Sequence, residues 1–194
     1  MKNVKLLSLC SALIFLAGTP LLPEFQPDPM VKKGKEYALQ VKAELAKNLL
    51  GAIAQRGTAG AVDFCNVKAI PITDSLSTKL GVKIRRATDQ PRNPDNLGTG
   101  DELAYINETK LDLMQNKEIK PKLLRKDSVA VGYYPIITNA MCLQCHGEKG
   151  SEIAYETLKV IMEKYPDDKA TGYSSNQLRG IWVVEMPLEE SDEK

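Results

Sequence analysis

The chain contains a single histidine, His146, which ends the pentapeptide Cys142-Leu143-Gln144-Cys145-His146. Two cysteines at this spacing lie on one helical turn, so both thiols can form thioether bonds to the vinyl groups of one haem. The imidazole that follows then lies under the iron and can bind it. The motif therefore predicts one covalently bound haem c per chain, attached through Cys142 and Cys145, with His146 as the proximal iron ligand.

Other uses of a C-x-x-C motif need features that this chain lacks. A structural zinc site requires a second pair of cysteine or histidine ligands, and the sequence has no second histidine. A thioredoxin-like motif normally follows the first strand of a β-α-β unit, whereas this motif lies late in the chain. The sequence therefore favours haem attachment over zinc binding or thiol redox chemistry.

Residues 1–20 are typical of a secretory signal peptide. Lys2 and Lys5 precede the apolar segment 6–17, and no acidic residue interrupts this order. Pro20 makes a poor cleavage site, so an uncleaved membrane anchor is the second interpretation of the same segment. We therefore expect a periplasmic protein that contacts the membrane only through such an anchor.

Behind this segment, residues 21–30 are rich in proline and predict a linker, and residues 31–190 predict one domain. The formal net charge is +1 at pH 7, and it falls to −1 without residues 1–20, which carry two lysines and no acid. Lysines and arginines do not cluster as they do in nucleic-acid-binding domains, so we expect no nucleic-acid partner.

Apolar periodicity, glycines and prolines predict helices separated from strands by loops. Pro71 is expected to stop or kink an early helix, and Thr99 is expected to cap a later one together with Glu102. This order of elements predicts the α+β class. Helices are expected over 30–56, 61–69, 73–80, 99 to about 117, and 151–165, and strands over 82–88, 129–137 and 180–188.

The sixth iron ligand cannot be a second histidine, so a cysteine, a methionine, a neutral donor and an open position all stay possible. Cys65 has no intramolecular disulfide partner once Cys10 leaves with the signal peptide and the haem occupies the other two cysteines. In an oxidising compartment, such a thiol is either buried as a small core residue or has a functional role. The methionine candidates are Met114, Met162 and Met186.

Three stretches of the chain form an ordered set that is more specific than C-x-x-C-H alone. They are AVDFCNVKAIPIT at 61–73, RRATDQPRNPDN at 85–96, and YYPIITNAMCLQCHG at 133–147 with DKATGYSSNQLRGIWVVEMPL at 168–188. In these stretches the chain resembles the PAS-like periplasmic c-haem domain family, catalogued as a domain of unknown function. Members of that family occur alone and in front of bacterial sensor proteins.

The resemblance implies a PAS-like antiparallel sheet with N-terminal helices and one covalently bound haem c held against it. It also implies that Cys65 occupies the family's axial cysteine position, opposite His146. His146 and Cys65 are therefore the predicted iron ligands.

Two further residues are predicted to contact the haem. Arg92 lies in the matched Arg-Asn-Pro segment, and its planar guanidinium suits a haem propionate; Arg85 and Arg86 are weaker candidates. Tyr134 ends the strand before the motif and is predicted to pack on the haem ring. A solvated loop charge for each arginine and ordinary core packing for Tyr134 are the alternatives.

Two functions fit such a protein. The first is one-electron transfer with an unknown redox partner. The second is a haem-based redox or gas sensor, which would signal through a partner because no output domain follows in the sequence. The chain offers no spare histidine and no evident acid–base pair, so we do not expect an enzyme.

Overall fold

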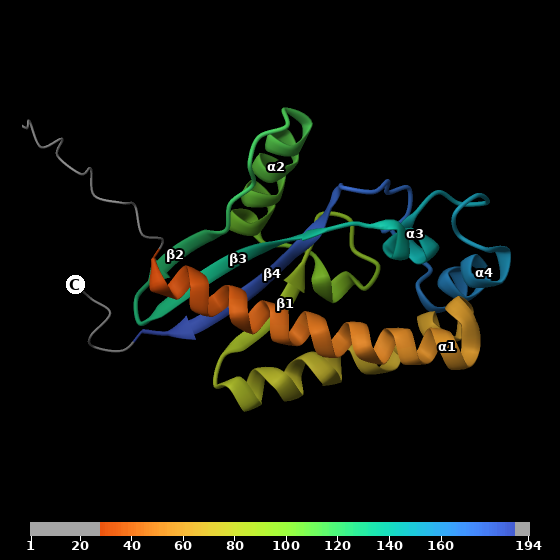
Figure 1. The fold of residues 1–194 in the computed structure, drawn as a ribbon, viewed down its shortest axis with the longest axis horizontal. Coiled ribbons are helices and arrows are strands. Elements are labelled where there is room, and N and C mark those ends of the chain that lie inside the picture. The colour runs from red at the N-terminus through yellow and green to blue at the C-terminus, as the bar shows by residue number, and fades with distance from the viewer. Residues whose placement is uncertain (1–27, 189–194) are drawn as a thin grey trace, which may run out of the picture.

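The computed structural model describes residues 28–188, which form an α+β fold with a four-stranded antiparallel sheet (Figure 1). This confirms the predicted class. The signal peptide 1–20 and most of the linker 21–30 lie outside the described residues. Among residues 28–188, no helix combines the length and apolar character that crossing a bilayer requires.

The elements are α1 (Pro29–Leu80), β1 (Lys83–Ala87), the 3-10 helix η1 (Pro94–Asn96), α2 (Gly100–Met114), β2 (Lys122–Lys126), β3 (Val129–Ile137), α3 (Ala140–His146), α4 (Tyr155–Lys164) and β4 (Leu178–Pro187).

Helix α1 consists of two arms that turn back on each other at Gly57 (Figure 1). Gly57 has φ 66° and ψ −178°, a backbone conformation that glycine adopts far more readily than other residues. The predicted stop at Pro71 is wrong, because helical geometry continues through it to Leu80. Pro71 and Val67 are both exposed, so water can bind the Val67 carbonyl, which loses its helical N–H partner at Pro71.

The strands follow the order β1-β4-β3-β2, and every neighbouring pair is antiparallel. Strands β1, β3 and β4 confirm the three predicted strands, with boundaries within two residues. The sequence did not predict β2, whose residues Lys122, Arg125 and Lys126 break the apolar alternation. Charged side chains are common on such edge strands because they discourage pairing with another chain.

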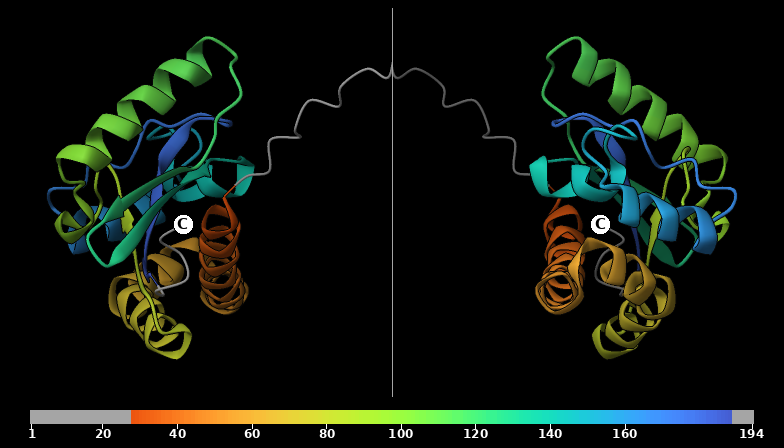
Figure 2. Two further views of the ribbon diagram at one scale, coloured as in Figure 1. Left: turned by 90° about the vertical axis from the view of Figure 1, so that its left-hand side faces the viewer. Right: turned by 90° about the vertical axis from the view of Figure 1, so that its right-hand side faces the viewer.

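Helices cover both faces of the sheet, with α1 on one face and α2 on the other (Figure 2). Alternate residues of each strand therefore enter two separate apolar clusters. Helix α2 begins with the predicted capping box, in which Thr99 and Glu102 each bond the other's backbone. The cluster under α1 includes Ile84, Tyr134, Trp182, Val184 and Met186, and the cluster under α2 includes Ala87, Tyr105, Ile106, Tyr133, Ile181 and Val183.

Candidate functional site

The C-x-x-C-H motif forms helix α3, at the end of the sheet where the turn of α1 and helix α4 also lie (Figure 1). Asn139 caps α3, because its side-chain oxygen accepts hydrogen bonds from the backbone N–H groups of Met141 (3.0 Å) and Cys142 (3.2 Å). Both motif cysteines are half-buried and carry free thiols. Residues 133–147 thus place two available thiols on one short, capped helix directly after β3.

His146 is held from two sides by the loop that leads into β4. Its Nδ1 lies 2.7 Å from the Ala170 carbonyl oxygen, and its own carbonyl accepts a hydrogen bond from the Tyr173 backbone N–H at 2.9 Å. A carbonyl can only accept, so Nδ1 carries the proton in this contact and Nε2 keeps a free electron pair. This is the arrangement in which a histidine binds a metal.

The charges around His146 favour its neutral form. Burial lowers the pKa of the imidazole well below its usual value, and the nearby guanidinium groups of Arg179 and Arg92 lower it further. The hydrogen bond to Ala170 opposes this shift only in part. The imidazole therefore keeps its electron pair available near neutral pH.

A mostly buried ion pair braces the same loop. The Nε and one terminal nitrogen of Arg92 lie 3.1 Å from the two carboxylate oxygens of Asp168, and the side chains are 12% and 7% exposed. Arg92 also donates to the carbonyls of Cys145 (2.6 Å) and Ala170 (3.4 Å). Arg92 therefore ties the haem motif to the loop that orients His146. Its predicted contact with a propionate stays a prediction. For Asp168, the only signal in the sequence was its place at the start of the family stretch 168–188.

Cys65 lies on the second arm of α1, and it is one of the groups that raise the pKa of the Cys145 thiol. Val62, one helical turn earlier, packs with Ile161 of α4 and with Cys145. Burial raises the pKa of the Cys65 thiol, and the positive charges of Arg86 and Arg92 partly oppose that rise. Three segments far apart in sequence thus bring Cys65 to the motif.

The methionine candidates lie elsewhere. Met114 at the end of α2 is 79% exposed, and Met162 on α4 is 64% exposed. Met186 is buried in the cluster between α1 and the sheet. None of the three packs in the cluster of Val62, Ile153 and Ile161 that contacts Cys145.

Tyr134 lies in the apolar cluster between α1 and the sheet. A Cβ atom at Gly34 or Gly132 would lie 2.0 Å or 2.4 Å from its hydroxyl oxygen, so both glycines make room for this side chain. Burial raises the pKa of its hydroxyl. Core packing accounts for these surroundings, and the predicted contact with the haem ring stays untested.

The neighbouring arginines of β1 point to opposite faces of the sheet. Arg85 forms an ion pair with Glu102 of α2, whereas Arg86 lies over the ring of Trp182, 6.0 Å from its centroid, on the α1 face. Arg86 therefore shares a face with Cys65, and Arg85 does not.

Tyr173 and Arg179 adjoin His146, and no pattern in the sequence assigned them a role. The Tyr173 ring meets the imidazole edge-on, with centroids 6.4 Å apart. The Arg179 guanidinium carbon lies 5.4 Å from the centroid of that ring. The only available signal was the match of both residues to the late motif of the family.

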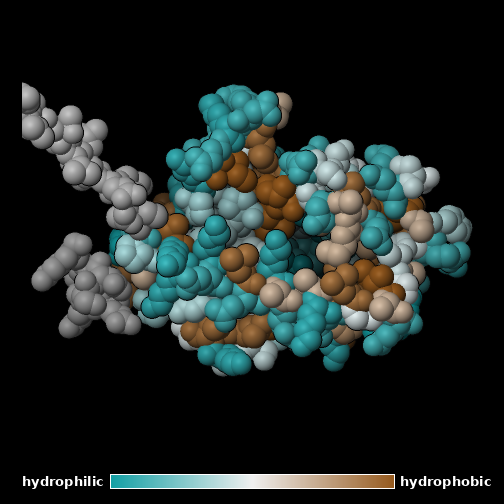
Figure 3. All heavy atoms as spheres, viewed as in Figure 1, coloured by the Kyte–Doolittle hydropathy of each residue, from teal (hydrophilic) through white to brown (hydrophobic). Residues whose placement is uncertain are grey.

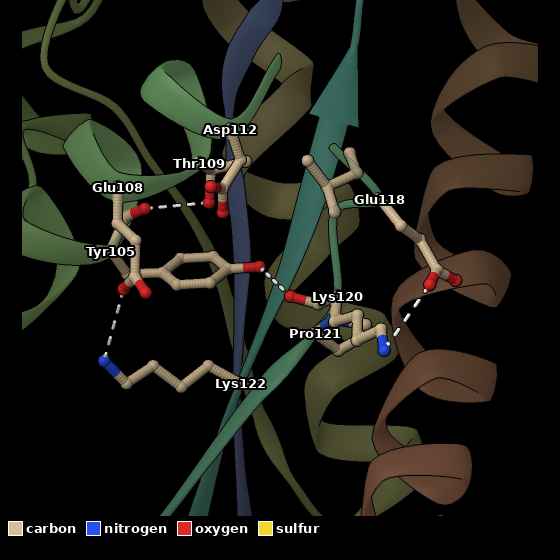
Figure 4. Close-up of a pocket in the computed structure, with 9 residues that line it drawn as sticks. Tyr105, Glu108, Thr109, Asp112, Glu118, Lys120, Pro121 and Lys122 are labelled. Atoms are coloured by element: carbon tan, nitrogen blue, oxygen red, sulfur yellow. Dashed lines mark hydrogen bonds and ion pairs between the residues drawn. The ribbon is translucent and has the colours of Figure 1, made fainter. Parts of the chain in front are cut away.

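Two cavities lie away from the motif. One of about 360 Å³ is lined by α2 and the segment before β2 (Figure 4), and its residues Glu108 and Lys122 form an ion pair of 3.8 Å. A second, of about 390 Å³, lies between the end of α1 and β1. In Figure 3, the surface is also hollowed between α1 and α3, beside the motif.

The donor set at this end of the sheet fits a haem c. Cys142 and Cys145 offer two thiols on one turn, and His146 offers a neutral nitrogen donor. Among residues 28–188, buried polar atoms without a hydrogen-bond partner include the Tyr173 hydroxyl and Arg179 Nε, both beside His146. Buried donors of this kind suit a ligand that carries acceptor oxygens.

Fold and site together define a domain with an antiparallel sheet, a helical hairpin on one face and a C-x-x-C-H helix at one end. Residues 25–187 match the Tll0287-like family, and the chain belongs to it. This confirms the family resemblance seen in the sequence.

One solved structure extends the comparison. The chain is similar to the cyanobacterial heme-protein Tll0287, with 22% identity and a TM-score of 0.57 over 84% of this chain and 97% of that one. At this identity the likeness shows a shared fold. No curated protein matches the sequence.

Proposed function

We propose that this protein binds one haem c covalently through Cys142 and Cys145, with His146 and Cys65 as axial ligands, and acts as a one-electron carrier in the periplasm. The observation that carries the proposal is the 2.7 Å contact from His146 Nδ1 to the Ala170 carbonyl, beside two free thiols on a capped helix. The description of the related Tll0287 as a heme-protein supports the choice of cofactor.

Each residue has a defined task in this proposal. Cys142 and Cys145 form the thioether bonds, and the Ala170 carbonyl orients His146 so that Nε2 can bind iron. Arg92 keeps that loop in place through Asp168. A bound haem would supply a reversible one-electron change at its iron.

Cys65 gives the site its specific character. The positive charges of Arg86 and Arg92 favour its thiolate, while burial favours the neutral thiol. A thiolate ligand stabilises ferric iron and so lowers the reduction potential. We therefore expect a carrier of low potential that keeps both ligands when oxidised.

The same balance supports a second candidate, a redox or gas sensor. Burial raises the pKa of the Cys65 thiol, so protonation of Cys65 would compete with its binding to the iron of a reduced haem. Loss of Cys65 would then open a position for a small gas. A sensor of this kind acts through a partner protein, and we propose no enzymatic activity for either candidate.

Absorption spectroscopy of protein made with a c-haem maturation system tests the proposal. We expect covalent haem, detected as a pyridine haemochrome, and its loss in the variant with both Cys142→Ser and Cys145→Ser. Absence of covalent haem in the unmodified chain would refute the proposal.

Two single variants test the second ligand. Cys65→Ser should abolish a thiolate-type ferric spectrum. The matched control is Met162→Leu, at an exposed position of α4, and it should leave the spectrum unchanged. An unchanged spectrum in Cys65→Ser rejects Cys65 as ligand. Ready binding of carbon monoxide by the reduced protein would favour the sensor, and refusal would favour the electron carrier.

A further inference from the structure

Two buried hydrogen-bond donors beside His146 have no partner among the described residues: the Tyr173 hydroxyl and Arg179 Nε. Tyr173 is 5% exposed, and its ring lies between the imidazole and the Arg179 guanidinium, in contact with both. An unpaired buried donor destabilises a fold. Two of them, on side chains that contact each other beside His146, therefore indicate a ligand with acceptor atoms.

The charges of the neighbouring arginines sharpen this inference. Arg92 is neutralised by Asp168, and Arg85 by Glu102 on the far face of the sheet. Arg179 has only neutral hydrogen-bond acceptors in the described part of the chain, Thr88 Oγ1 at 3.0 Å and the Gln90 carbonyl at 3.2 Å. Asp168 interacts electrostatically with Arg179, but its hydrogen bonds come from Arg92 and from the Ala170 backbone N–H. The Arg179 charge thus lacks an anionic partner in direct contact.

We propose that Arg179 and Tyr173 form a carboxylate-binding site next to His146. A carboxylate has two acceptor oxygens, which can take one hydrogen bond from Arg179 Nε–H and one from the Tyr173 hydroxyl. It also supplies the negative charge that Arg179 lacks. The loop that contains Tyr173 places the site within reach of the motif, because the same loop holds His146 through Ala170.

The carboxylate can come from two sources. A haem propionate is the first, and this assignment rests on the proposed function. A free small carboxylate is the second, and it does not. Either source places the anion on Arg179 and Tyr173, whether or not Arg92 meets a propionate as well.

The test compares Tyr173→Phe and Arg179→Gln with the control Arg85→Gln. Tyr173→Phe removes one oxygen atom that has no protein partner, so the fold should be retained. If Arg179→Gln does not fold, Arg179→Lys keeps the charge and still removes the Nε–H donor. All variants are made as full chains with the haem-maturation system, and covalent haem is quantified first.

The first measurement is the propionate bending band in the resonance Raman spectrum. A shift in both Tyr173→Phe and Arg179→Gln, but not in Arg85→Gln, supports the site with a haem propionate as its ligand. The second measurement follows the Arg179 Nε–H signal by NMR during titration with acetate. A saturable change, weakened about tenfold or more in Tyr173→Phe, supports the site with a free carboxylate as its ligand.

Failure of this site and failure of the proposed function give different results. Covalent haem with neither a Raman shift nor an acetate response would overturn the carboxylate site and leave the proposed function intact. Absence of covalent haem would refute the proposed function, and the acetate titration of the purified chain then decides the site alone: saturable binding supports it, and no response overturns it.

Discussion

The middle of the sheet and its His146 end are built on opposite principles. In the middle, both faces are closed by apolar clusters in which Ile181 and Val184 have no exposed surface. At the His146 end, the buried polar groups include an ion pair, Arg92–Asp168, and two donors without partners, whereas the middle of the sheet holds one such donor, the Tyr134 hydroxyl. The first region stabilises the fold, whereas the second places polar groups where they cost stability unless a ligand satisfies them.

The contrast is clearest at two neighbouring residues of β1. Strand alternation sends Arg85 to the α2 face, where Glu102 neutralises it, and Arg86 to the α1 face, near Cys65. One step along the chain thus separates a half-buried ion pair from a charge that acts on the candidate ligand. The sequence shows two adjacent arginines, and only their faces tell them apart.

The largest effect should come from the ion pair at the His146 end. Arg92→Gln leaves the buried Asp168 carboxylate uncompensated and should lower the free energy of unfolding by about 3–5 kcal/mol, measured by urea denaturation. Adding Asp168→Asn should recover part of this loss, because the unpaired charge is then gone. A loss under about 1 kcal/mol, as for an exposed pair, would show that the Arg92–Asp168 pair is not a buried ion pair on which stability depends.

The middle of the sheet should respond to lost volume. Ile181→Ala creates a cavity beneath α2 and should cost about 2–5 kcal/mol while covalent haem and its spectrum stay unchanged. Leu111→Ala, at an exposed position of α2, is the control. Its free energy of unfolding should stay within about 0.5 kcal/mol of that of the unmodified protein. An altered haem spectrum in Ile181→Ala would show that the two regions are not independent.

A smaller effect is expected where α1 meets the sheet. Gly34→Ala places a Cβ 2.0 Å from the Tyr134 hydroxyl oxygen and should destabilise the protein by about 1–3 kcal/mol through overpacking. Tyr134→Phe removes the closest of the three atoms in conflict but leaves Tyr134 Cζ at 2.8 Å and Met186 Cε at 2.9 Å, so it should restore part of the loss in thermal unfolding of the double variant. Equal losses in single and double variants would place the conflict elsewhere.

The smallest effect concerns pH. In chain prepared without haem, the folded protein lowers the pKa of His146 below its ordinary 6.5, so the unfolded chain binds more protons as the medium becomes acidic. The contribution of His146 to the free energy of unfolding is then fully present above about pH 6.5. It declines as the pH falls toward the lowered pKa. The melting temperature of His146→Gln, followed over the same range, should lose this component. An identical pH profile in both proteins would argue against a buried neutral imidazole.

Local chemistry was enough to predict much of the fold. The capping box at Thr99, the apolar strand 129–137 and the glycine that ends the first arm of α1 all act over a few residues. Strand β2 was missed because its charged residues lack apolar alternation, and Pro71 was misjudged because an exposed helix tolerates one missing hydrogen bond.

The sequence by itself determined the α+β class, the order of the main elements and the C-x-x-C-H motif, since these depend on short spacings along the chain. Only the tertiary structure decided which arginine meets Asp168, that Tyr134 packs against Gly34, and that Tyr173 and Arg179 adjoin His146. Arg92 and Asp168 are 76 residues apart, and such pairs form only when distant segments pack together. Their partners follow from burial and charge in three dimensions, which no local pattern encodes.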